Sequence, residues 1–173
     1  NINLIGIGTG NLKHLTIAAI NILNESDLIL VPKKSEDTKD LINLRYEICS
    51  KFLKKENKNL VEFKVPERNK EKIYSESVND WHEKLAMSWD KAIKNFKGKK
   101  NNISLLIWGD PCLYDSSIKI SKILFSETNI SIIPGITSIQ VLLSEHKITL
   151  NNIGKSVQIT TGRNLKSVGF QKY

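Results

Sequence analysis

The stretch LLIWGDPCLYDSS, residues 105–117, decides the fold that we expect for this chain. Residues 103–107 are uncharged and rich in branched side chains, which is typical of a strand buried on both faces of a parallel sheet. Gly109 and Pro111 then end the strand, because glycine lets the backbone approach a ligand closely and proline cannot continue a strand. We therefore expect a strand, a turn and a helix in this part of the chain.

The turn after this strand is a candidate binding site, because ligands of open α/β sheets bind at the carboxyl ends of the strands. The alternative is a tight turn without a ligand, since Gly, Asp and Pro favour turns in any case. Three residues can cap the helix expected at 117–125, namely Asp115, Ser116 and Ser117. A strand at 130–133 and the loop Pro134-Gly135-Ile136-Thr137-Ser138 repeat this layout, so two loops at one sheet edge would line one cleft.

The rest of the chain alternates strands and helices. Further strands are expected at 2–7, 28–31 and 60–65, and further helices at 15–23, 38–52 and 78–96, with one more beginning near residue 138. This alternation predicts an α/β fold with a mostly parallel sheet and right-handed crossovers. Residues 151–154 are interpreted as a linker and 156–160 as a new strand. The predicted domains are therefore 1–150 and 151–173, the second being an incomplete α/β domain.

The first loop carries glycines at positions 6, 8 and 10, which can bring backbone N–H groups against an anion. Their spacing is not G-x-G-x-x-G, and the second strand ends in Pro32-Lys33 where a ribose-binding acid would stand. No G-K-[S/T] follows either. We therefore do not expect NAD or ATP to bind.

The formal net charge of +8 comes from basic residues spread along the chain rather than gathered in a stripe with aromatic residues. Nucleic acid is therefore not expected as a partner, whereas a small polyanion is attracted. No apolar run approaches the roughly 18 residues of a membrane helix, so no membrane partner is expected. Cys49 and Cys112 form neither a metal-ligand spacing nor a disulfide framework, which favours a cytoplasmic protein without a metal.

Three motifs, in this order and spacing, resemble the tetrapyrrole methylases of corrin and sirohaem synthesis. They are Gly6-Ile7-Gly8-Thr9-Gly10 with Leu15-Thr16, Trp108-Gly109-Asp110-Pro111 with Tyr114, and Pro134-Gly135-Ile136-Thr137-Ser138. Other segments resemble the members of that family that also remove an acetyl group. These are Asp40-Leu41 with Leu44-Arg45, Pro66-Glu67-Arg68, residues 112–116, and Asn152-Ile153-Gly154 with residues 159–163.

This resemblance implies two α/β domains with S-adenosyl-L-methionine, the methyl donor, in the cleft between them. It further implies that precorrin-5 is methylated at ring carbon C-1 and that acetate is released, on the aerobic route to cobalamin. The alternatives are another precorrin or sirohaem methyltransferase and a non-catalytic, truncated donor-binding module. A homodimer is left open, and family residues that bind the donor are expected beyond Tyr173, so the chain is expected to be incomplete and inactive.

The resemblance also implies site residues. The donor-binding positions are Thr9, Trp108, Gly109, Asp110, Leu113, Thr137, Ser138 and Thr161. The family usually has proline at the position of Thr9, so a donor contact at Thr9 departs from the family's pattern. The tetrapyrrole-binding candidates are Gly8, Gly10, Arg45, Arg68, Tyr114 and Arg163, the arginines as forks for substrate carboxylates. Methyl transfer needs mainly orientation, whereas deacetylation needs proton transfer, for which Asp110, Asp115 and His82 are candidates among which the sequence does not choose.

Overall fold

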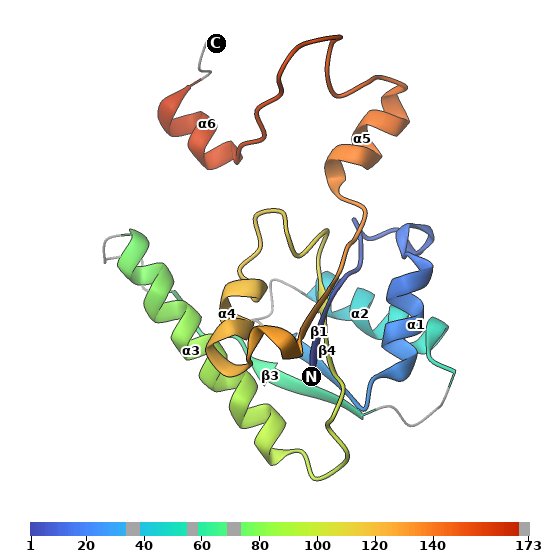
Figure 1. Ribbon diagram of the computed structural model, residues 1–173, viewed down its shortest axis with the longest axis vertical. Coiled ribbons are helices and arrows are strands. Elements are labelled where there is room, and N and C mark those ends of the chain that lie inside the picture. Colours follow the sequence, from blue (N-terminus) through green and yellow to red (C-terminus); the bar gives the residue numbers. More distant parts are fainter. Residues whose placement is uncertain (34–38, 55–58, 69–73, 170–173) are drawn as a thin grey trace. The chain divides into compact units, whose positions relative to one another are not determined.

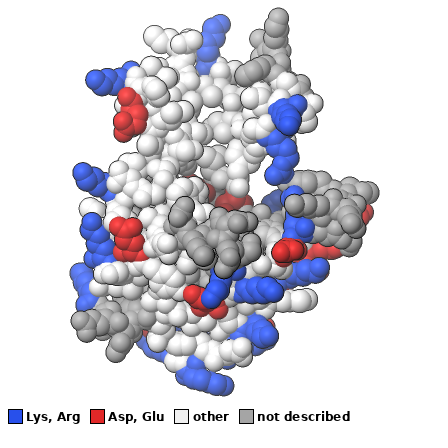
Figure 2. All heavy atoms as spheres, turned by 180° about the vertical axis from the view of Figure 1, so that it is seen from behind, with Lys and Arg blue, Asp and Glu red and all other residues white. Residues whose placement is uncertain are grey.

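The computed structural model describes residues 1–33, 39–54, 59–68 and 74–169. The chain divides into two compact units, Asn1–Ser138 and Ile139–Tyr173. None of the helices in these described ranges combines the length and the apolar character that crossing a bilayer requires. Lys and Arg side chains are scattered over the face in Figure 2, with acidic side chains among them.

The first unit is built on a five-stranded parallel sheet in the order β3-β2-β4-β1-β5 (Figure 1). Its strands are β1 (Ile2–Gly6), β2 (Leu28–Lys33), β3 (Asn59–Lys64), β4 (Ile103–Ile107) and β5 (Ile130–Ile133). The predicted α/β fold is thus confirmed, and β4 and β5 begin and end where the sequence predicts. β1 pairs with β4 on one side and with β5 on the other.

Helices cover both faces of this sheet (Figure 1). α1 (Ile17–Glu25) and α2 (Lys39–Phe52) pack on one face, and α3 (Tyr74–Asn95) and α4 (Ser117–Leu124) pack on the other. Because side chains alternate along a strand, Leu28 and Leu30 belong to the core under α3 and α4, whereas Ile29 and Val31 belong to the core under α1 and α2. The strands β1 and β4 and most of β2 are therefore buried on both faces, which explains their continuous apolar runs, whereas the edge strands β3 and β5 are partly exposed.

The chain reverses its direction across the sheet between β1 and β4. From β1 the connections through α1 and α2 lead to β2 and β3, toward one edge. From β4 the connection through α4 leads to β5, at the other edge. Neighbouring strands whose connections leave in opposite directions form a topological switch point, and the loops beyond it are the usual ligand site of an open α/β sheet.

Two local predictions need correction. The helix expected at 15–23 is α1, which begins at Ile17 and ends at Glu25, because the Thr16 hydroxyl accepts the Ala19 N–H at 3.1 Å and begins the helix there. A short 3-10 helix, η1 (Leu12–His14), precedes it. Residues 156–160 are not a strand, because a strand exists only by pairing and the sheet of the described residues comprises β1 to β5. Residue 38 of the predicted helix 38–52 lies outside the described residues.

The second unit contains α6 (Gly162–Val168), and α5 (Ser138–His146) leads into it from the first unit. The Thr161 hydroxyl begins α6 by accepting the Asn164 N–H at 3.3 Å. The segment between α5 and α6 is exposed, and Gly154 lies there with a φ of +69° and open space where a side chain would be.

Candidate functional site

The loops after β1 and β4 are bound to each other at the switch point. The Gly109 N–H donates to the Gly8 carbonyl at 2.8 Å, and the Gly8 N–H donates to the Gly109 carbonyl at 3.2 Å. Both glycines have positive φ angles, +74° at Gly8 and +70° at Gly109, which favour glycine over other residues. The two motifs that the sequence singled out therefore meet in one place.

The loop after β5 joins the same cluster by backbone contact. A Cβ atom added at Gly135 would lie 2.1 Å from the Gly109 carbonyl oxygen, and one added at Gly6 would lie 2.5 Å from the Gly135 nitrogen. These distances leave no room for a side chain, so glycine is required at positions 6 and 135 for steric reasons. We call the segments 6–10, 108–115 and 134–138 the loop cluster.

Asp110 ties two members of the loop cluster together. Its Oδ1 accepts the Cys112 N–H at 2.7 Å, within its own turn. Its Oδ2 accepts the Gly135 N–H at 2.8 Å, across the end of β1. Both carboxylate oxygens are thus used by backbone donors, and burial, followed by the charge of Asp110, raises the pKa of the Cys112 thiol.

Open space remains next to Gly109 in the loop cluster. A Cβ atom at Gly109 would meet no other atom within 4 Å, although the neighbouring glycines are tightly packed. Trp108 is 44% exposed, and its ring lies over Gly10, where an added Cβ would be 3.0 Å from the Cη2 atom. A ligand can therefore approach bare backbone at Gly109 with an indole beside it.

The remainder of the 108–115 turn presents polar and aromatic groups. Tyr114 is 61% exposed and has a φ of +52°, an outlier for an aromatic residue, and such outliers cluster at functional sites. The Asp115 Oδ1 accepts the Ser117 N–H at 2.7 Å, so Asp115, rather than either serine, provides the side-chain cap at the start of α4. Leu113 is half-buried, and its N–H donates to the Asp110 carbonyl.

Other predicted site residues differ in their surroundings. Thr137 is buried and Ser138 exposed, both at the end of the β5 loop, and Thr9 lies in the first loop with its Oγ1 3.1 Å from the Nδ1 atom of His14. Thr161 and Arg163 belong to the second unit, at the start of α6.

The three predicted arginines are not equivalent. Arg45 is buried, and its Nε and Nη1 donate to the carbonyls of Leu106 and Leu41, each at 3.0 Å. Burial lowers the pKa of its guanidinium, and the negative charge of Asp115 offsets part of that effect. Arg68 is half-buried in the segment after β3, and Arg163 is exposed.

His82 lies away from these loops, on α3 in the layer that α3 and α4 form. It is 7% exposed, and its Nε2 is buried without a hydrogen-bond partner in the described structure. Burial, followed by the positive charge of Lys119 on α4, lowers the pKa of the imidazole. His82 is therefore a buried neutral histidine rather than a surface or capping residue.

Comparison with known proteins identifies the family. The sequence profile of the tetrapyrrole (corrin/porphyrin) methylases matches residues 1–170. The chain belongs to this family. Among its members, the precorrin-6A synthase [deacetylating] of Sinorhizobium sp is 40% identical over 167 residues, which cover 94% of this chain and 64% of that protein.

Two solved structures of tetrapyrrole methylases share the fold. A cobalamin synthesis related protein (CobF) from Corynebacterium diphtheriae matches 97% of this chain and 66% of its own, with a TM-score of 0.72 and 32% identity. The uroporphyrin III C-methyl transferase of Thermus thermophilus matches 88% of this chain and 54% of its own, with a TM-score of 0.51 and 17% identity. The chain thus spans about two thirds of the length of the relatives that match it at 30% identity or more.

Sequence reasoning missed two features of this site. The contact of Gly135 with Gly6 and Gly109 joins three distant segments, and no local pattern signals it. His14 could have been found, because a histidine in the loop after a first strand lies at the edge of the sheet where ligands bind.

Proposed function

We propose that the protein of which this chain is part is a precorrin-6A synthase. It transfers the methyl group of S-adenosyl-L-methionine to C-1 of precorrin-5 and releases the acetyl group as acetate. The observation that carries this proposal is the loop cluster, where bare glycine backbone with open space lies at the switch point of a tetrapyrrole-methylase fold. The 40% identity to a precorrin-6A synthase supports this particular substrate.

The residues present fit the methyl donor. Open space at Gly109 suits a ligand held by backbone groups, because a side chain at this position would fill that space. S-adenosyl-L-methionine would supply an electrophilic methyl group on a sulfonium. We assign its binding to Thr9, Trp108, Gly109, Asp110, Leu113, Thr137 and Ser138 in the first unit and to Thr161 in the second. The chain's contribution to methyl transfer is orientation and the exclusion of water.

The tetrapyrrole would be held by its carboxylates and its flat ring. Arg68 and Arg163 are proposed to bind carboxylates, and Tyr114, with Gly8 and Gly10, to contact the ring. Arg45 is the third proposed fork. Because it also donates to two backbone carbonyls, its replacement would disturb the end of β4 as well. We propose that residues from 151 onward begin the second domain, and that the protein is cytoplasmic, which suits its two free thiols.

Donor binding tests this proposal through a matched pair of glycines. Gly109 and Gly154 have nearly the same φ, +70° and +69°, and an added Cβ meets nothing within 4 Å at either. Gly109→Val and Gly154→Val therefore carry similar backbone strain, but only the first fills the proposed site. In the complete protein, calorimetry with S-adenosyl-L-methionine should show affinity reduced at least about tenfold by Gly109→Val and nearly unchanged by Gly154→Val.

The substrate is tested by product analysis. Wild-type protein incubated with precorrin-5 and the methyl donor should give a methylated, deacetylated product by mass spectrometry, together with free acetate. Methylation of a different precorrin or of a sirohaem precursor would assign the protein to another branch of the family. Donor binding without any methylation would identify a binding module and contradict the proposal.

A further inference from the structure

We propose that His14 carries the proton in the deacetylation step. This inference rests on the proposed function, because only the deacetylating reaction needs a group that activates water. The residues considered so far for that role are Asp110, Asp115 and His82. The structure places His14 beside the loop cluster. Asp110 and Asp115 accept hydrogen bonds from backbone N–H groups, and His82 is buried.

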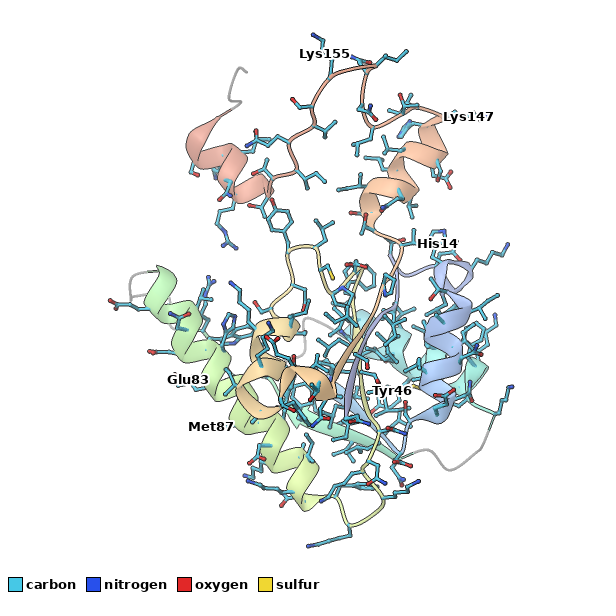
Figure 3. The ribbon with its side chains drawn as sticks, in the orientation of Figure 1. His14, Tyr46, Glu83, Met87, Lys147 and Lys155 are labelled. Carbon is cyan, nitrogen blue, oxygen red and sulfur yellow. The ribbon has the colours of Figure 1, made fainter. Side chains whose placement is uncertain are left out.

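His14 is held against the loop cluster by local structure. It is the last residue of η1, whose start is fixed by the Asn11 side chain accepting the Lys13 N–H at 3.0 Å. A Cβ atom added at Gly8 would lie 3.0 Å from the His14 Cβ and 3.6 Å from the Ile136 carbonyl oxygen. His14 thus packs on Gly8, which is itself bonded to Gly109. Figure 3 shows His14 at the end of the first unit where β1 leads into its loop, far along the unit from Met87 on α3.

The imidazole ring is oriented by one hydrogen bond. Its Nδ1 lies 3.1 Å from the Thr9 hydroxyl oxygen, and among the described residues Thr9 is the only hydrogen-bond partner recorded for the ring. The side chain is half-buried, so the Nε2 atom remains for a ligand or a water molecule. When Nδ1 carries the hydrogen, it donates to the Thr9 hydroxyl and leaves a lone pair on Nε2, which is the form of a general base.

The three other candidates are less suited to proton transfer. Both oxygens of Asp110 accept backbone N–H groups, and Oδ1 of Asp115 caps α4. His82 is buried in the helix layer with a lowered pKa. His14 combines proximity to the loop cluster, a fixed ring and a basic nitrogen without an assigned partner in the described structure.

The chemistry balances with water as the co-reactant. His14 Nε2 takes a proton from a water molecule, whose oxygen attacks the carbonyl carbon of the acetyl group. The bond between that carbon and the macrocycle breaks, and its electron pair stays on the macrocycle. The macrocycle carbon that carried the acetyl group takes the methyl group of S-adenosyl-L-methionine in its place. Acetic acid leaves as acetate, and it and the imidazolium each lose a proton to solvent. Nothing is oxidised or reduced, and His14 ends neutral, as it began.

The test measures the two products separately in the complete protein. His14→Gln keeps a polar side chain of similar reach but cannot exchange a proton. With precorrin-5 and S-adenosyl-L-methionine, its rate of acetate release should fall at least about 100-fold, since general acid–base catalysis contributes about 10² to 10⁴. Formation of S-adenosylhomocysteine should fall in parallel, because the methyl group enters at the carbon that the acetyl group leaves, whereas the affinity for S-adenosyl-L-methionine in calorimetry should stay within about threefold of wild type. Added imidazole should restore acetate release to His14→Ala.

Matched variants separate a chemical role from a structural one. Thr9→Val should slow acetate release less than His14→Gln does, because it leaves the imidazole in place. Its donor affinity is measured as well, since Thr9 is also a proposed donor contact. Lys13→Gln, one residue away and exposed, should change neither product. A fall in donor affinity as large as the fall in acetate release in His14→Gln, or no fall in acetate release, overturns the inference while leaving methyl transfer by the wild type intact. A wild-type protein that methylates nothing overturns the proposed function and this inference with it.

Discussion

At each end of the sheet an aspartate carboxylate accepts two backbone N–H groups, but the two aspartates serve different purposes. At the amino ends of the strands, Asp27 Oδ2 accepts the N–H groups of Asn101 and Asn102, each at 3.0 Å. At the carboxyl ends, Asp110 likewise accepts two backbone N–H groups. The partners of Asp27 are two asparagines, whereas one partner of Asp110 is glycine, and a Cβ atom added at the adjoining Gly109 would meet nothing within 4 Å.

The charge environment differs in the same way. Lys99 lies 3.6 Å from Asp27. Burial raises the pKa of Asp27, but the hydrogen bonds from Asn102 and Asn101 and the charge of Lys99 together lower it further than burial raises it. We conclude that the Asp27 carboxylate, at the amino ends of the strands, contributes to stability alone. At the other end, the Asp110 carboxylate also ties the 108–115 and 134–138 loops together beside the open position at Gly109.

The largest effect is expected from Gly135→Ala, at the carboxyl ends of the strands. The new methyl group would lie 2.1 Å from the Gly109 carbonyl oxygen, so backbone must move. We expect the free energy of unfolding to fall by more than about 3 kcal/mol, since overpacking of backbone exceeds the usual cost of an extra methyl group. Urea denaturation measures this loss. Gly162→Ala, where an added Cβ meets nothing within 4 Å, is the control, and equal stability of the two variants would contradict the described contact.

Asp110→Ala should have the next largest effect. It leaves the N–H groups of Cys112 and Gly135 without their acceptor, which we expect to cost about 2–3 kcal/mol of unfolding free energy. Asp110→Asn retains one acceptor oxygen and should lose roughly half as much. Denaturation and donor calorimetry should change in parallel across the two variants. Full affinity for S-adenosyl-L-methionine in Asp110→Ala would show that the hydrogen bonds of Asp110 do not position the loops.

Asp27→Asn tests the opposite end and should affect stability only. Because the folded-state pKa of Asp27 lies below its ordinary value of 3.8, its charge stabilises the fold above that pH and ceases to do so as the pH falls through the folded pKa. We expect a loss of about 1–2 kcal/mol at pH 7 that disappears in strongly acidic solution. Thermal unfolding over a pH series measures it. If this variant bound S-adenosyl-L-methionine more weakly, Asp27 would also contribute to donor binding, and the difference inferred between the two ends of the sheet would be wrong.

His82→Leu, in the helix layer between the two ends, should have the smallest effect. The buried Nε2 has no hydrogen-bond partner in the described structure, so an apolar replacement should change stability at pH 7 by less than about 1 kcal/mol. The lowered pKa of His82 means that the unfolded chain binds a proton more readily as the pH falls below 6.5, so wild-type stability declines there. The variant should lose that part of the pH dependence, and acetate release should not change.

The sequence predicted the sheet well because burial on both faces imposes a local pattern. The bounds of β4 and β5 follow from runs of branched side chains ended by Gly109 and Pro134, and these signals lie within a few residues. Residues 156–160 also contain branched side chains but are not a strand. A pairing partner decides that outcome, and no local pattern supplies one.

The candidate site was only partly predictable for the same reason. The motifs at Gly8 and Gly109 indicated the correct edge of the sheet, since the end of a parallel strand is known once the strand is known. The contact of Asp110 with Gly135 across the end of β1 depends on the order of the strands in the sheet, and this order could not be predicted from the sequence. Burial of Arg45 and His82 depends likewise on how helices pack, so their sequence patterns resembled those of residues that contact a ligand.

The position of β1 between β4 and β5 also affects how the chain folds during synthesis. Ile2 pairs with Ile103 and with Ile130, so the strand made first completes its hydrogen bonds only after the strands made fourth and fifth. At about 5–20 residues per second, a ribosome needs roughly 5–25 s to deliver those partners. During that interval an apolar segment leaves the exit tunnel without its neighbours. Such long-range pairing slows folding, so nascent chains that stall before residue 103 should bind holdase chaperones through residues 2–7.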